Sequence, residues 1–431
     1  MADKLMGARR TLTLGFSFQC LGYFFIAYSA LSGSYIYLYA GLGFVVIGRA
    51  IGNTAPPIIL SSVYKDKDSR LDSAFTYLYM INNIGAFLAQ LVAPIIYKLF
   101  GAPTAFALSG IGMAINVIGF VMMRKLTRQA GTEADHRHIS SVRMAGYTLG
   151  ALVAVAISSY LLKHLTITHY LMGIAAVVIL VMIIRVLLKE SVKTRIHMLV
   201  GLILMVQAYL FFILYNQMPT SLNFFALHNI EPSIFGIAVP AASFQAFNPF
   251  WIIVLSPVLA SFYNYLDNRG KDPSMPAKFA FGMFFCAIAF GMAGVSRFFA
   301  DEQGMLSSFW IGGPHLFFAI GELLISALGQ SMIAKLFPRH IRGFSFGAWN
   351  MTLALASVSG AWVASFSATS ETAGEVTTPL ETLSHYSHYF LYMALATLVI
   401  CVLCALFAPK LARMIDDEPE SGKELQTAEP A

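Results

Sequence analysis

Glu322 is the residue from which a chemical interpretation of this sequence starts. It is the lone acid of FAIGELLISALGQSMIAKLF, which lies in a long apolar run that begins near Ser308. A charged side chain at the centre of a bilayer costs roughly 2.5–3.5 kcal/mol on insertion scales, so such a group generally faces water or a partner. A carboxyl group in that position can bind a cationic ligand, or bind and release a proton. The plainer alternative is a hydrogen bond between two packed helices, and we favour the substrate or proton site.

Arg49 is the basic counterpart, in the run FVVIGRAIGNTAPPIIL. Asn53 follows it by four residues, so both side chains can lie on one face of a helix. Pro56 and Pro57 remove backbone donors and are expected to kink that helix or to leave carbonyl groups free. Three interpretations of Arg49 stay open. It binds a ligand, it pairs with a carboxylate, or its side chain extends to the nearer membrane surface.

Amide and aromatic side chains occupy other apolar segments. Tyr79 and Asn83 are four residues apart, Asn248 stands at the start of FNPFWIIVLSP, and Trp349 precedes an asparagine. An asparagine inside a membrane span often only joins helices, for about 0.6 kcal/mol on average. Together, however, one acid, one base and several amides and tyrosines suit a zwitterion. That chemistry favours a peptide or an amino acid over a sugar or a lipid as the ligand.

The composition indicates which elements must hold these residues. Of the 431 residues, 57% are hydrophobic and 12% are charged, about half the ~25% that is average for globular proteins. We therefore expect an all-α, polytopic membrane protein without enzymatic activity. Apolar segments long enough to cross a ~30 Å hydrocarbon core lie at about 12–31, 36–62, 73–97, 103–123, 144–162, 169–188, 196–217, 244–265, 279–298, 308–333, 344–366 and 387–408.

The cysteines and the net charge indicate neither a metalloprotein nor a nucleic-acid-binding protein. The four cysteines all lie in apolar segments, where they are poorly placed to hold a metal ion, so we expect no metal site and no cofactor. The net charge of +6 is spread over short loops, which does not indicate a nucleic-acid partner.

The loops alternate in their content of Lys and Arg. Taken alternately, one set carries almost all of these residues, and the opposite set carries only Lys98, Lys163 and Arg297. Loops rich in Lys and Arg stay in the cytoplasm. This pattern supports an even number of spans and predicts that both termini are cytoplasmic.

Several runs resemble the proton-dependent oligopeptide transporters, and among them the bacterial di- and tripeptide permeases. DSAFTYLYMINNIGAFLAQLVAP is similar to the aromatic-rich helix of that family, which is followed by Asn-x-Gly. The runs QMPTSLNFFALHNIE, FNPFWIIVLSP, and IGELLISALGQSMIAKLFP followed by GFSFGAW resemble its seventh, eighth, tenth and eleventh core helices. The similarity covers nearly the whole chain, and its motifs occur in the order of the family.

The resemblance implies a major facilitator fold, in which two helical bundles rock around a central site. It also implies proton-driven symport of di- and tripeptides by a monomer in the bacterial inner membrane, with protons as coupling ion and short peptides and membrane lipid as partners. The expected organisation is an incomplete amino-terminal bundle over 1–143, a linking helix pair over 144–195, a carboxy-terminal six-helix bundle over 196–408 and an acidic cytoplasmic tail over 409–431.

The family's site residues carry over to matching positions of this sequence. Glu322 stands where the family binds the peptide amino terminus, and we assign proton coupling to it as well. Asn83 and Asn248 stand where the family holds the peptide backbone or carboxylate. Tyr79 lines the same pocket, and Trp349 belongs to the family's Gly-x-Trp run.

Two departures from the family pattern qualify this expectation. Asp3, Lys4, Gly7, Arg9 and Arg10 match a loop that follows two helices in the family, and the sequence opens at that loop. The first of those helices carries a Glu-x-x-Glu-Arg-Phe-x-Tyr-Tyr motif for proton coupling, and the motif is absent from this sequence. We therefore expect about twelve spans, arranged as four, two and six.

The second departure concerns the lysine that the family carries in its fourth helix. Asn53 occupies that position here. Arg49, one turn earlier, can supply the charge of the lysine but not its ability to lose a proton. Both departures keep two alternatives open: a remnant or scaffold that no longer transports, and a major facilitator carrier for another small solute.

Overall fold

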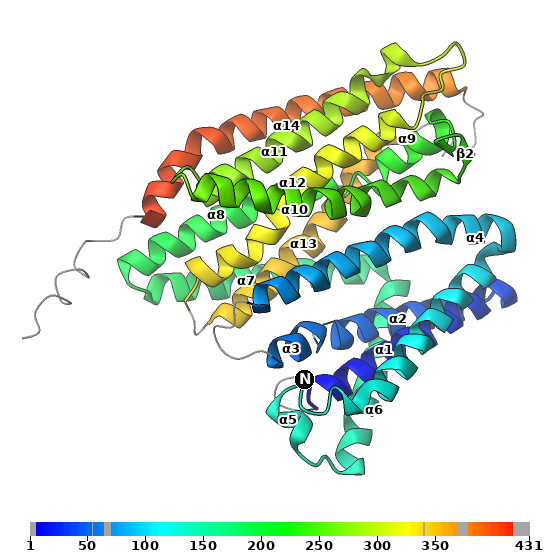
Figure 1. The fold of residues 1–431 in the computed structure, drawn as a ribbon, viewed down its shortest axis with the longest axis vertical. Helices are drawn as coiled ribbons and strands as arrows, with labels where there is room; N and C mark the ends of the chain where they lie inside the picture. Colours follow the sequence, from blue (N-terminus) through cyan, green and yellow to red (C-terminus); the bar gives the residue numbers. More distant parts are fainter. Residues whose placement is uncertain (1–5, 54, 64–69, 339–340, 369–377, 417–431) are drawn as a thin grey trace, which may run out of the picture. The chain divides into compact units, whose positions relative to one another are not determined.

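The protein is described by a computed structural model over residues 6–53, 55–63, 70–338, 341–368 and 378–416. It is built of helices that run roughly along one another within each part of the chain (Figure 1). In these ranges the strands are β1, Ser233–Ile234, and β2, Ile237–Ala238, which form one short antiparallel hairpin. The described chain is therefore all-α in architecture, as predicted.

The helices form two compact units. The first comprises Met1–Gly85 and Val92–Gly173, and the second comprises Ala86–Leu91 and Ile174–Ala431. The elements of the first unit, some of which continue into the second, are α1 Ala8–Ser32, α2 Tyr35–Gly52, α3 Ala55–Ser62, α4 Arg70–Met122, η1 Met123–Lys125, α5 Glu133–His136, α6 Ser141–Lys163 and α7 Leu165–Lys189.

Glycines allow α1 and α2 to pack backbone against backbone. A Cβ atom added to Gly15 would lie 2.5 Å from Gly52 Cα, and one added to Gly22 would lie 2.7 Å from the Gly41 carbonyl oxygen. Small residues at such contacts let membrane helices approach closely, where dispersion and packing replace the hydrophobic effect that lipid cannot supply. The glycine-rich sequence of α2 is thus explained by its contact with α1.

Two breaks in this unit follow from local sequence. The helix α2 ends at Gly52, and α3 begins at Ala55, just before Pro56 and Pro57, so the predicted break at the proline pair is present. In α4 the backbone at Gly101 has φ 79° and ψ 171°, which is outside the helical region, and the long helix is kinked there. Glycine tolerates this positive φ because it has no Cβ.

The second unit contains a helical bundle with an aromatic core. Its elements are α8 Val192–Tyr215, α9 Ser221–Asn229, η2 Ala241–Ala246, α10 Phe247–Asp267, α11 Met275–Val295, η3 Ser296–Phe299, α12 Phe309–Leu336, α13 Arg342–Ala364, η5 Ser365–Ser367 and α14 Pro379–Asp416. Phe290 meets Phe318 edge to face at 5.2 Å, and Phe225 meets Phe390 in the same way at 5.5 Å. These rings are fully buried and hold α9, α11, α12 and α14 together.

Ten helical segments of the described chain are long and apolar enough to cross a membrane. One of them, Tyr77–Lys125, has 49 residues and contains the break at Gly101, so it holds two of the twelve predicted segments. The other difference from twelve is α13, a 23-residue helix that is not among the ten. The prediction of a polytopic helical membrane protein is confirmed.

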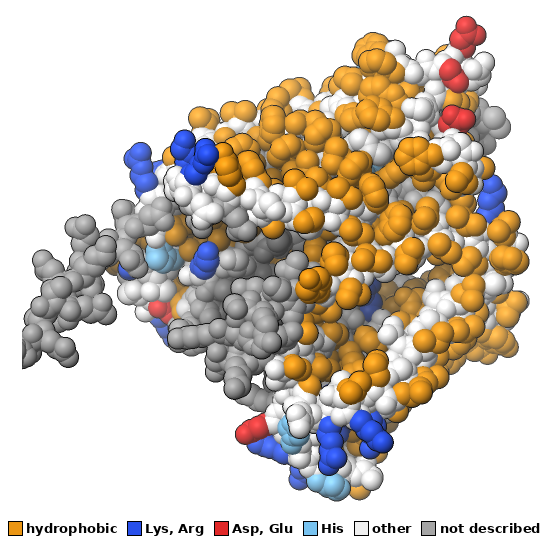
Figure 2. All heavy atoms as spheres, in the orientation of Figure 1, with side chains coloured by type: hydrophobic (Ala, Val, Ile, Leu, Met, Phe, Trp, Pro, Cys, Tyr) orange, Lys and Arg blue, Asp and Glu red, His pale blue; other side chains and the backbone are white. Residues whose placement is uncertain are grey.

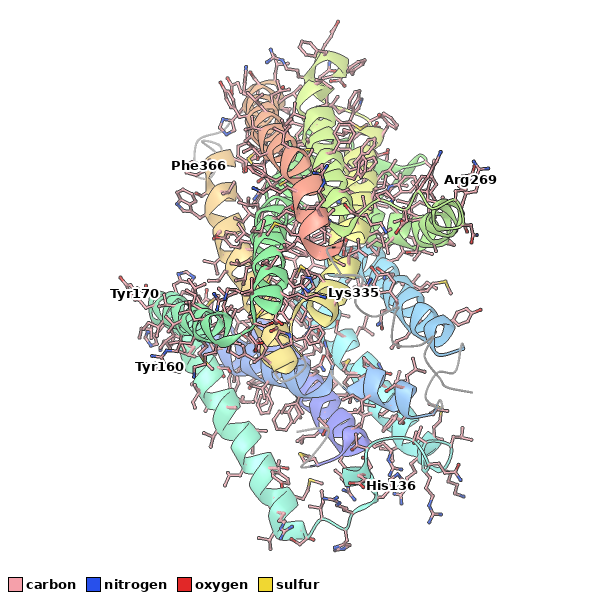
Figure 3. All side chains as sticks on the ribbon, turned by 90° about the vertical axis from the view of Figure 1, so that its left-hand side faces the viewer. His136, Tyr160, Tyr170, Arg269, Lys335 and Phe366 are labelled. Atoms are coloured by element: carbon pink, nitrogen blue, oxygen red, sulfur yellow. The ribbon has the colours of Figure 1, made fainter. Side chains whose placement is uncertain are left out.

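The surface agrees with a membrane environment. Hydrophobic side chains predominate on the face shown in Figure 2, and most of its Lys, Arg, Asp and Glu side chains lie near the edges of that face. Tyr160 in α6 and Tyr170 in α7 are 56% and 72% exposed and point outward (Figure 3). Amphipathic rings of this kind sit well at the boundary between lipid and water.

The last helix, α14, extends through Pro409 to Asp416. The described part of the predicted acidic tail is therefore helical, and residues 417–431 lie outside the described ranges.

Candidate functional site

Glu322 lies in the middle of α12 and accepts two hydrogen bonds on the same carboxylate oxygen. The Tyr215 hydroxyl donates to Glu322 Oε2 at 2.9 Å, and the Asn248 side-chain amide donates to the same atom at 3.3 Å. The tyrosine hydroxyl is also 3.5 Å from Asn248 Oδ1. Three helices of the second unit, α8, α10 and α12, thus meet at one carboxylate.

Each partner of Glu322 is positioned by the end of a helix. Tyr215 is the last residue of α8, and its ring meets Phe318 edge to face at 6.5 Å. Asn248 is the second residue of α10, and Pro249, which has no backbone N–H, follows it. The first turn of a helix tolerates proline because its backbone donors have no partner within the helix. The helix α10 therefore begins at a point from which the Asn248 side-chain amide reaches the Glu322 carboxylate.

The negative charge of Glu322 has no positive partner in the described part of this cluster. Among the described residues, no Lys, Arg or His forms an ion pair or a hydrogen bond with Glu322, and Oε1 accepts no hydrogen bond. The side chain is only half-buried. The carboxyl group therefore keeps one oxygen open for a proton or for a positively charged ligand group.

A second polar cluster of the same unit is closed. The Gln217 side-chain amide donates to the Gly360 carbonyl at 3.0 Å, and its oxygen accepts from Ser221 at 2.5 Å and from Tyr389 at 2.9 Å. Gln217 and Ser221 are fully buried. This cluster connects the turn after α8 and the start of α9 to α13 and α14. The hydrogen-bonding groups of Gln217 are all used, as expected of a structural network.

Trp349, on α13, is buried and packs against other core residues. Its ring meets Phe212 edge to face at 6.1 Å and lies directly against Gly329 of α12, where a Cβ atom would collide with it. The ring thus fills a space that Gly329 leaves open. Its predicted role in substrate binding stays a prediction.

The other predicted site residues belong to the first unit. Arg49 is exposed in the last turn of α2, and it has no ion pair or hydrogen bond from its side chain within the described chain. Asn53, also exposed, follows α2, and its backbone N–H donates to the Arg49 carbonyl at 3.0 Å. On α4, the Asn83 side-chain amide donates to the Tyr79 carbonyl at 3.0 Å, and Tyr79 is 42% exposed.

Tyr215 is the site residue that the sequence analysis did not single out. It is the last residue of α8 and directly precedes Asn216 and Gln217. A signal was present, because a tyrosine near the end of an apolar helix needs a hydrogen-bond partner for its hydroxyl. What the sequence did not show is that this partner is Glu322, 107 residues further along the chain.

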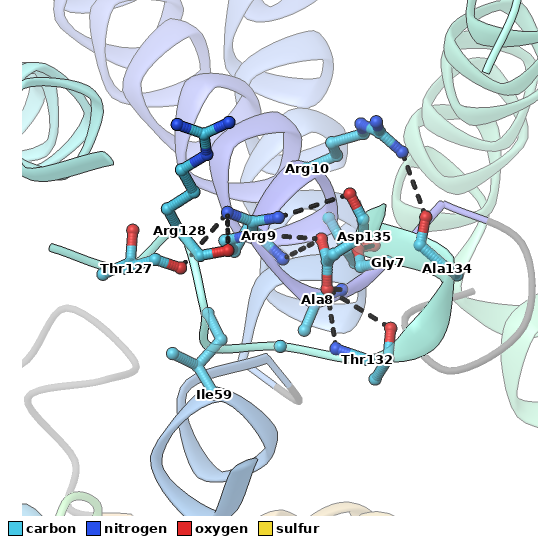
Figure 4. A network of polar contacts seen from close by, with 12 residues as sticks. Gly7, Ala8, Arg9, Arg10, Ile59, Thr127, Arg128, Thr132, Ala134 and Asp135 are labelled. Carbon is cyan, nitrogen blue, oxygen red and sulfur yellow. Dashed lines mark hydrogen bonds and ion pairs between the residues drawn. The ribbon is translucent and has the colours of Figure 1, made fainter. Parts of the chain in front are cut away.

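Asp135 forms a second carboxylate centre, in the first unit (Figure 4). It accepts hydrogen bonds from the backbone N–H groups of Ala8 at 2.8 Å, Arg9 at 3.0 Å and Thr132 at 2.9 Å. The Arg9 guanidinium Nε lies 3.6 Å away. The carboxylate thereby caps the first turn of α1, where helix N–H groups lack partners and the helix dipole favours negative charge.

Comparison with known proteins shows what kind of molecule carries these sites. The model of the POT family, the proton-dependent oligopeptide transporters, matches residues 9–380. This chain belongs to the POT family. The dipeptide and tripeptide permease B of Salmonella typhimurium is 39% identical over 416 residues, which are 96% of this chain and 84% of that relative. The dipeptide and tripeptide permease A of Chromobacterium violaceum is 40% identical over 418 residues, which are 97% and 83% of the two chains.

Solved structures of the POT family agree in fold. A bacterial homologue of the human drug peptide transporters PepT1 and PepT2 superposes with a TM-score of 0.82 at 30% identity, over 96% of this chain and 86% of that one. A tetrameric PepTSo2 gives a TM-score of 0.81 at 28% identity. The predicted family is confirmed. The protein is a multi-pass membrane transporter of the proton-dependent peptide class and not an enzyme.

Proposed function

We propose that this protein moves di- and tripeptides together with protons across the bacterial cytoplasmic membrane, and that Glu322 binds the peptide amino terminus and couples peptide binding to proton binding. The carboxylate carries the proposal, because it has an open oxygen and no cationic partner in the described chain. An ammonium group or a proton supplies the missing positive charge. The names of the related permeases, which state dipeptides and tripeptides, support this substrate class.

The geometry lets proton binding at Glu322 change how the site holds the peptide amino terminus. When Glu322 is ionised, Tyr215 donates to Oε2, and Oε1 is available to an ammonium group. When Glu322 is protonated, its charge no longer holds the ammonium group. The tyrosine hydroxyl can then turn toward Asn248 Oδ1, 3.5 Å away, because a hydroxyl both donates and accepts. The protonation state of Glu322 thereby changes how strongly the site holds the peptide amino terminus, which couples proton binding to peptide binding.

The remaining site residues bind the rest of the peptide in this proposal. Tyr79 and Asn83 contact its backbone, with Asn248 and Trp349 on the second unit. Arg49 binds its carboxylate, with Asn53 beside it. The exposed guanidinium of Arg49 supports this role, since it has no carboxylate partner among the described residues.

The proposed organisation follows the two bundles and their linker. Residues 1–143 and 196–408 form the bundles that rock, 144–195 form the linking pair, and 409–431 form a tail on the cytoplasmic side. The distribution of Lys and Arg among the loops supports cytoplasmic termini. We propose that the monomer is the transporting unit.

Uptake of a labelled dipeptide into whole cells, with and without a protonophore, tests the function. The parent chain should accumulate the dipeptide, and the protonophore should abolish accumulation. Glu322→Gln should remove uptake while the protein stays in the membrane, and the exposed loop residue Glu231 offers a matched control, Glu231→Gln, with normal uptake. Uptake by Glu322→Gln at the parental rate would exclude Glu322 from the mechanism. A parent chain that is present in the membrane but inactive would favour the non-transporting alternative.

A further inference from the structure

A basic cavity of about 570 Å³ opens in the first unit, beside the network shown in Figure 4. Its wall combines the first turns of α1, the end of α4 with η1, the segment around Asp135, and the start of α6. Its charged residues are Arg9, Arg10, Arg124 and Asp135. Among the described lining residues, one carboxylate stands against three guanidinium groups, which leaves two positive charges in excess.

The two arginines of α1 are held by the protein in different ways. Arg9 pairs with Asp135 and donates to the Thr127 and Arg128 carbonyls, both at 3.2 Å. Arg10 donates to the carbonyls of Ala134 at 3.2 Å and Arg137 at 3.1 Å. Carbonyl oxygens orient a guanidinium but do not neutralise it. Within the described ranges, Arg10 is therefore a fixed positive charge without an acidic partner on the wall of the cavity.

Arg124 adds a second uncompensated charge. It lies in η1, its side chain is exposed, and it forms no ion pair within the described ranges. Ser17 of α1 also lines the cavity, and its hydroxyl has no hydrogen bond among the described residues. Guanidinium and hydroxyl donors around one space are suited to the oxygens of a phosphate group.

The rest of the lining is apolar. Leu14 comes from α1, Phe120 and Val121 come from the last turn of α4, and Met144 comes from α6. A free phosphate ion is fully hydrated and gains nothing from such a surface, whereas an acyl chain does. The cavity therefore combines binding chemistry for an anionic head with a surface for a hydrocarbon tail. Basic pockets between membrane helices recognise anionic lipid head groups in this way.

We propose that this cavity binds an anionic phospholipid, with its phosphate between Arg10 and Arg124 and its acyl chain along Leu14, Phe120 and Met144. The lipid contacts α1, α4 and α6 at once. The site uses residues other than Glu322 and its partners, so it does not depend on the proposed transport mechanism.

Native mass spectrometry of the full chain, purified in detergent, tests the proposal with phosphatidylglycerol and phosphatidylcholine as probes. We expect phosphatidylglycerol to remain bound at concentrations where phosphatidylcholine does not. Arg124→Gln should weaken phosphatidylglycerol binding about fivefold, the effect of one basic residue near a membrane surface. Lys125→Gln is the matched control. It removes the same charge from the adjacent exposed residue, which does not line the cavity, and should leave the affinity unchanged.

Two further experiments complete the test. One asks whether the cavity itself is needed, and the other asks whether the bound phosphate group belongs to a lipid or to free phosphate. Ser17→Leu should narrow the cavity, remove one hydroxyl donor and reduce phosphatidylglycerol binding without removing any charge. Inorganic phosphate in the millimolar range should not displace the lipid. Equal loss in Arg124→Gln and Lys125→Gln would overturn the proposal, since it would show attraction to the whole basic surface. Full displacement by inorganic phosphate, or unchanged binding in Ser17→Leu, would also overturn it.

Discussion

Two carboxylates, Asp135 in the first unit and Glu322 in the second, show how differently one chemical group can be used in this protein. Asp135 is 6% exposed and accepts from three backbone N–H groups, with the Arg9 guanidinium beside it. Glu322 has two side-chain donors on one oxygen and no cation in the described chain. Asp135 has its charge and its oxygens satisfied by the fold, whereas Glu322 has a place for a ligand.

The comparison shows that the hydrogen-bond partners of a carboxylate, rather than its burial, indicate whether its role is structural or functional. A carboxylate bound by backbone N–H groups cannot exchange its partners without unfolding the helix that supplies them. A carboxylate bound by a hydroxyl and a side-chain amide can, because both groups rotate and both can also accept hydrogen bonds. Four substitutions, ordered by decreasing effect, test this difference between a structural and a functional site.

Asp135→Asn should have the largest effect, and on stability. Removing one member of a buried charge pair costs roughly 3–5 kcal/mol, because the other charge loses its compensation. The amide also places an N–H donor against backbone donors at the start of α1. Unfolding of the purified protein in mixed detergent measures the loss. A midpoint equal to that of the parent would show that the capping contacts of Asp135 are dispensable.

Glu322→Gln should instead abolish peptide uptake and leave stability within about 1 kcal/mol of the parent, since the glutamine oxygen still accepts from Tyr215 and Asn248. The physical reason for the lost uptake is that glutamine neither holds a charge for the ammonium group nor binds a proton. Uptake and unfolding are measured on the same preparations. A large loss of stability together with activity would place Glu322 with Asp135 as a structural acid.

Tyr215→Phe should reduce the rate of uptake about 10- to 100-fold, because a hydrogen bond to a charged group contributes about 1.5–3 kcal/mol. Tyr209→Phe is the matched control. It lies on the same helix, and its hydroxyl bonds to Ser359 at 2.7 Å rather than to Glu322. Initial uptake rates at low dipeptide concentration measure both variants. Equal effects in the two would show that the hydroxyl of Tyr215 has no special connection to Glu322.

Arg49→Ala should have the smallest effect, a weakening of dipeptide affinity, and Arg49→Lys should restore part of it if simple charge attracts the peptide carboxylate. The affinity is measured by competition with a labelled dipeptide. An equal loss in both variants would instead indicate a bidentate contact, which lysine cannot make. Unchanged affinity in both would remove Arg49 from the site.

Much of the fold follows from local properties of the sequence. The lengths of the apolar runs predicted most of the helices, because a helix must satisfy its own backbone hydrogen bonds in lipid. The break before Pro56 follows from the missing N–H of proline. The kink at Gly101 was predicted only as a gap between two apolar runs, since a glycine by itself does not specify its φ angle.

The lone acid in an apolar run of a helical membrane protein can be recognised from the residues alone, because bilayer insertion penalises charge at any position along the chain. The residues that surround this acid become known only when the packing of the helices is known. Tyr215 and Asn248 are 107 and 74 residues away from Glu322 along the chain. The same holds for Asp135, which lies in a polar segment and looks like an ordinary loop residue until α1 supplies its N–H groups. Hydrogen bonds between distant segments depend on how helices pack, and no local pattern encodes them.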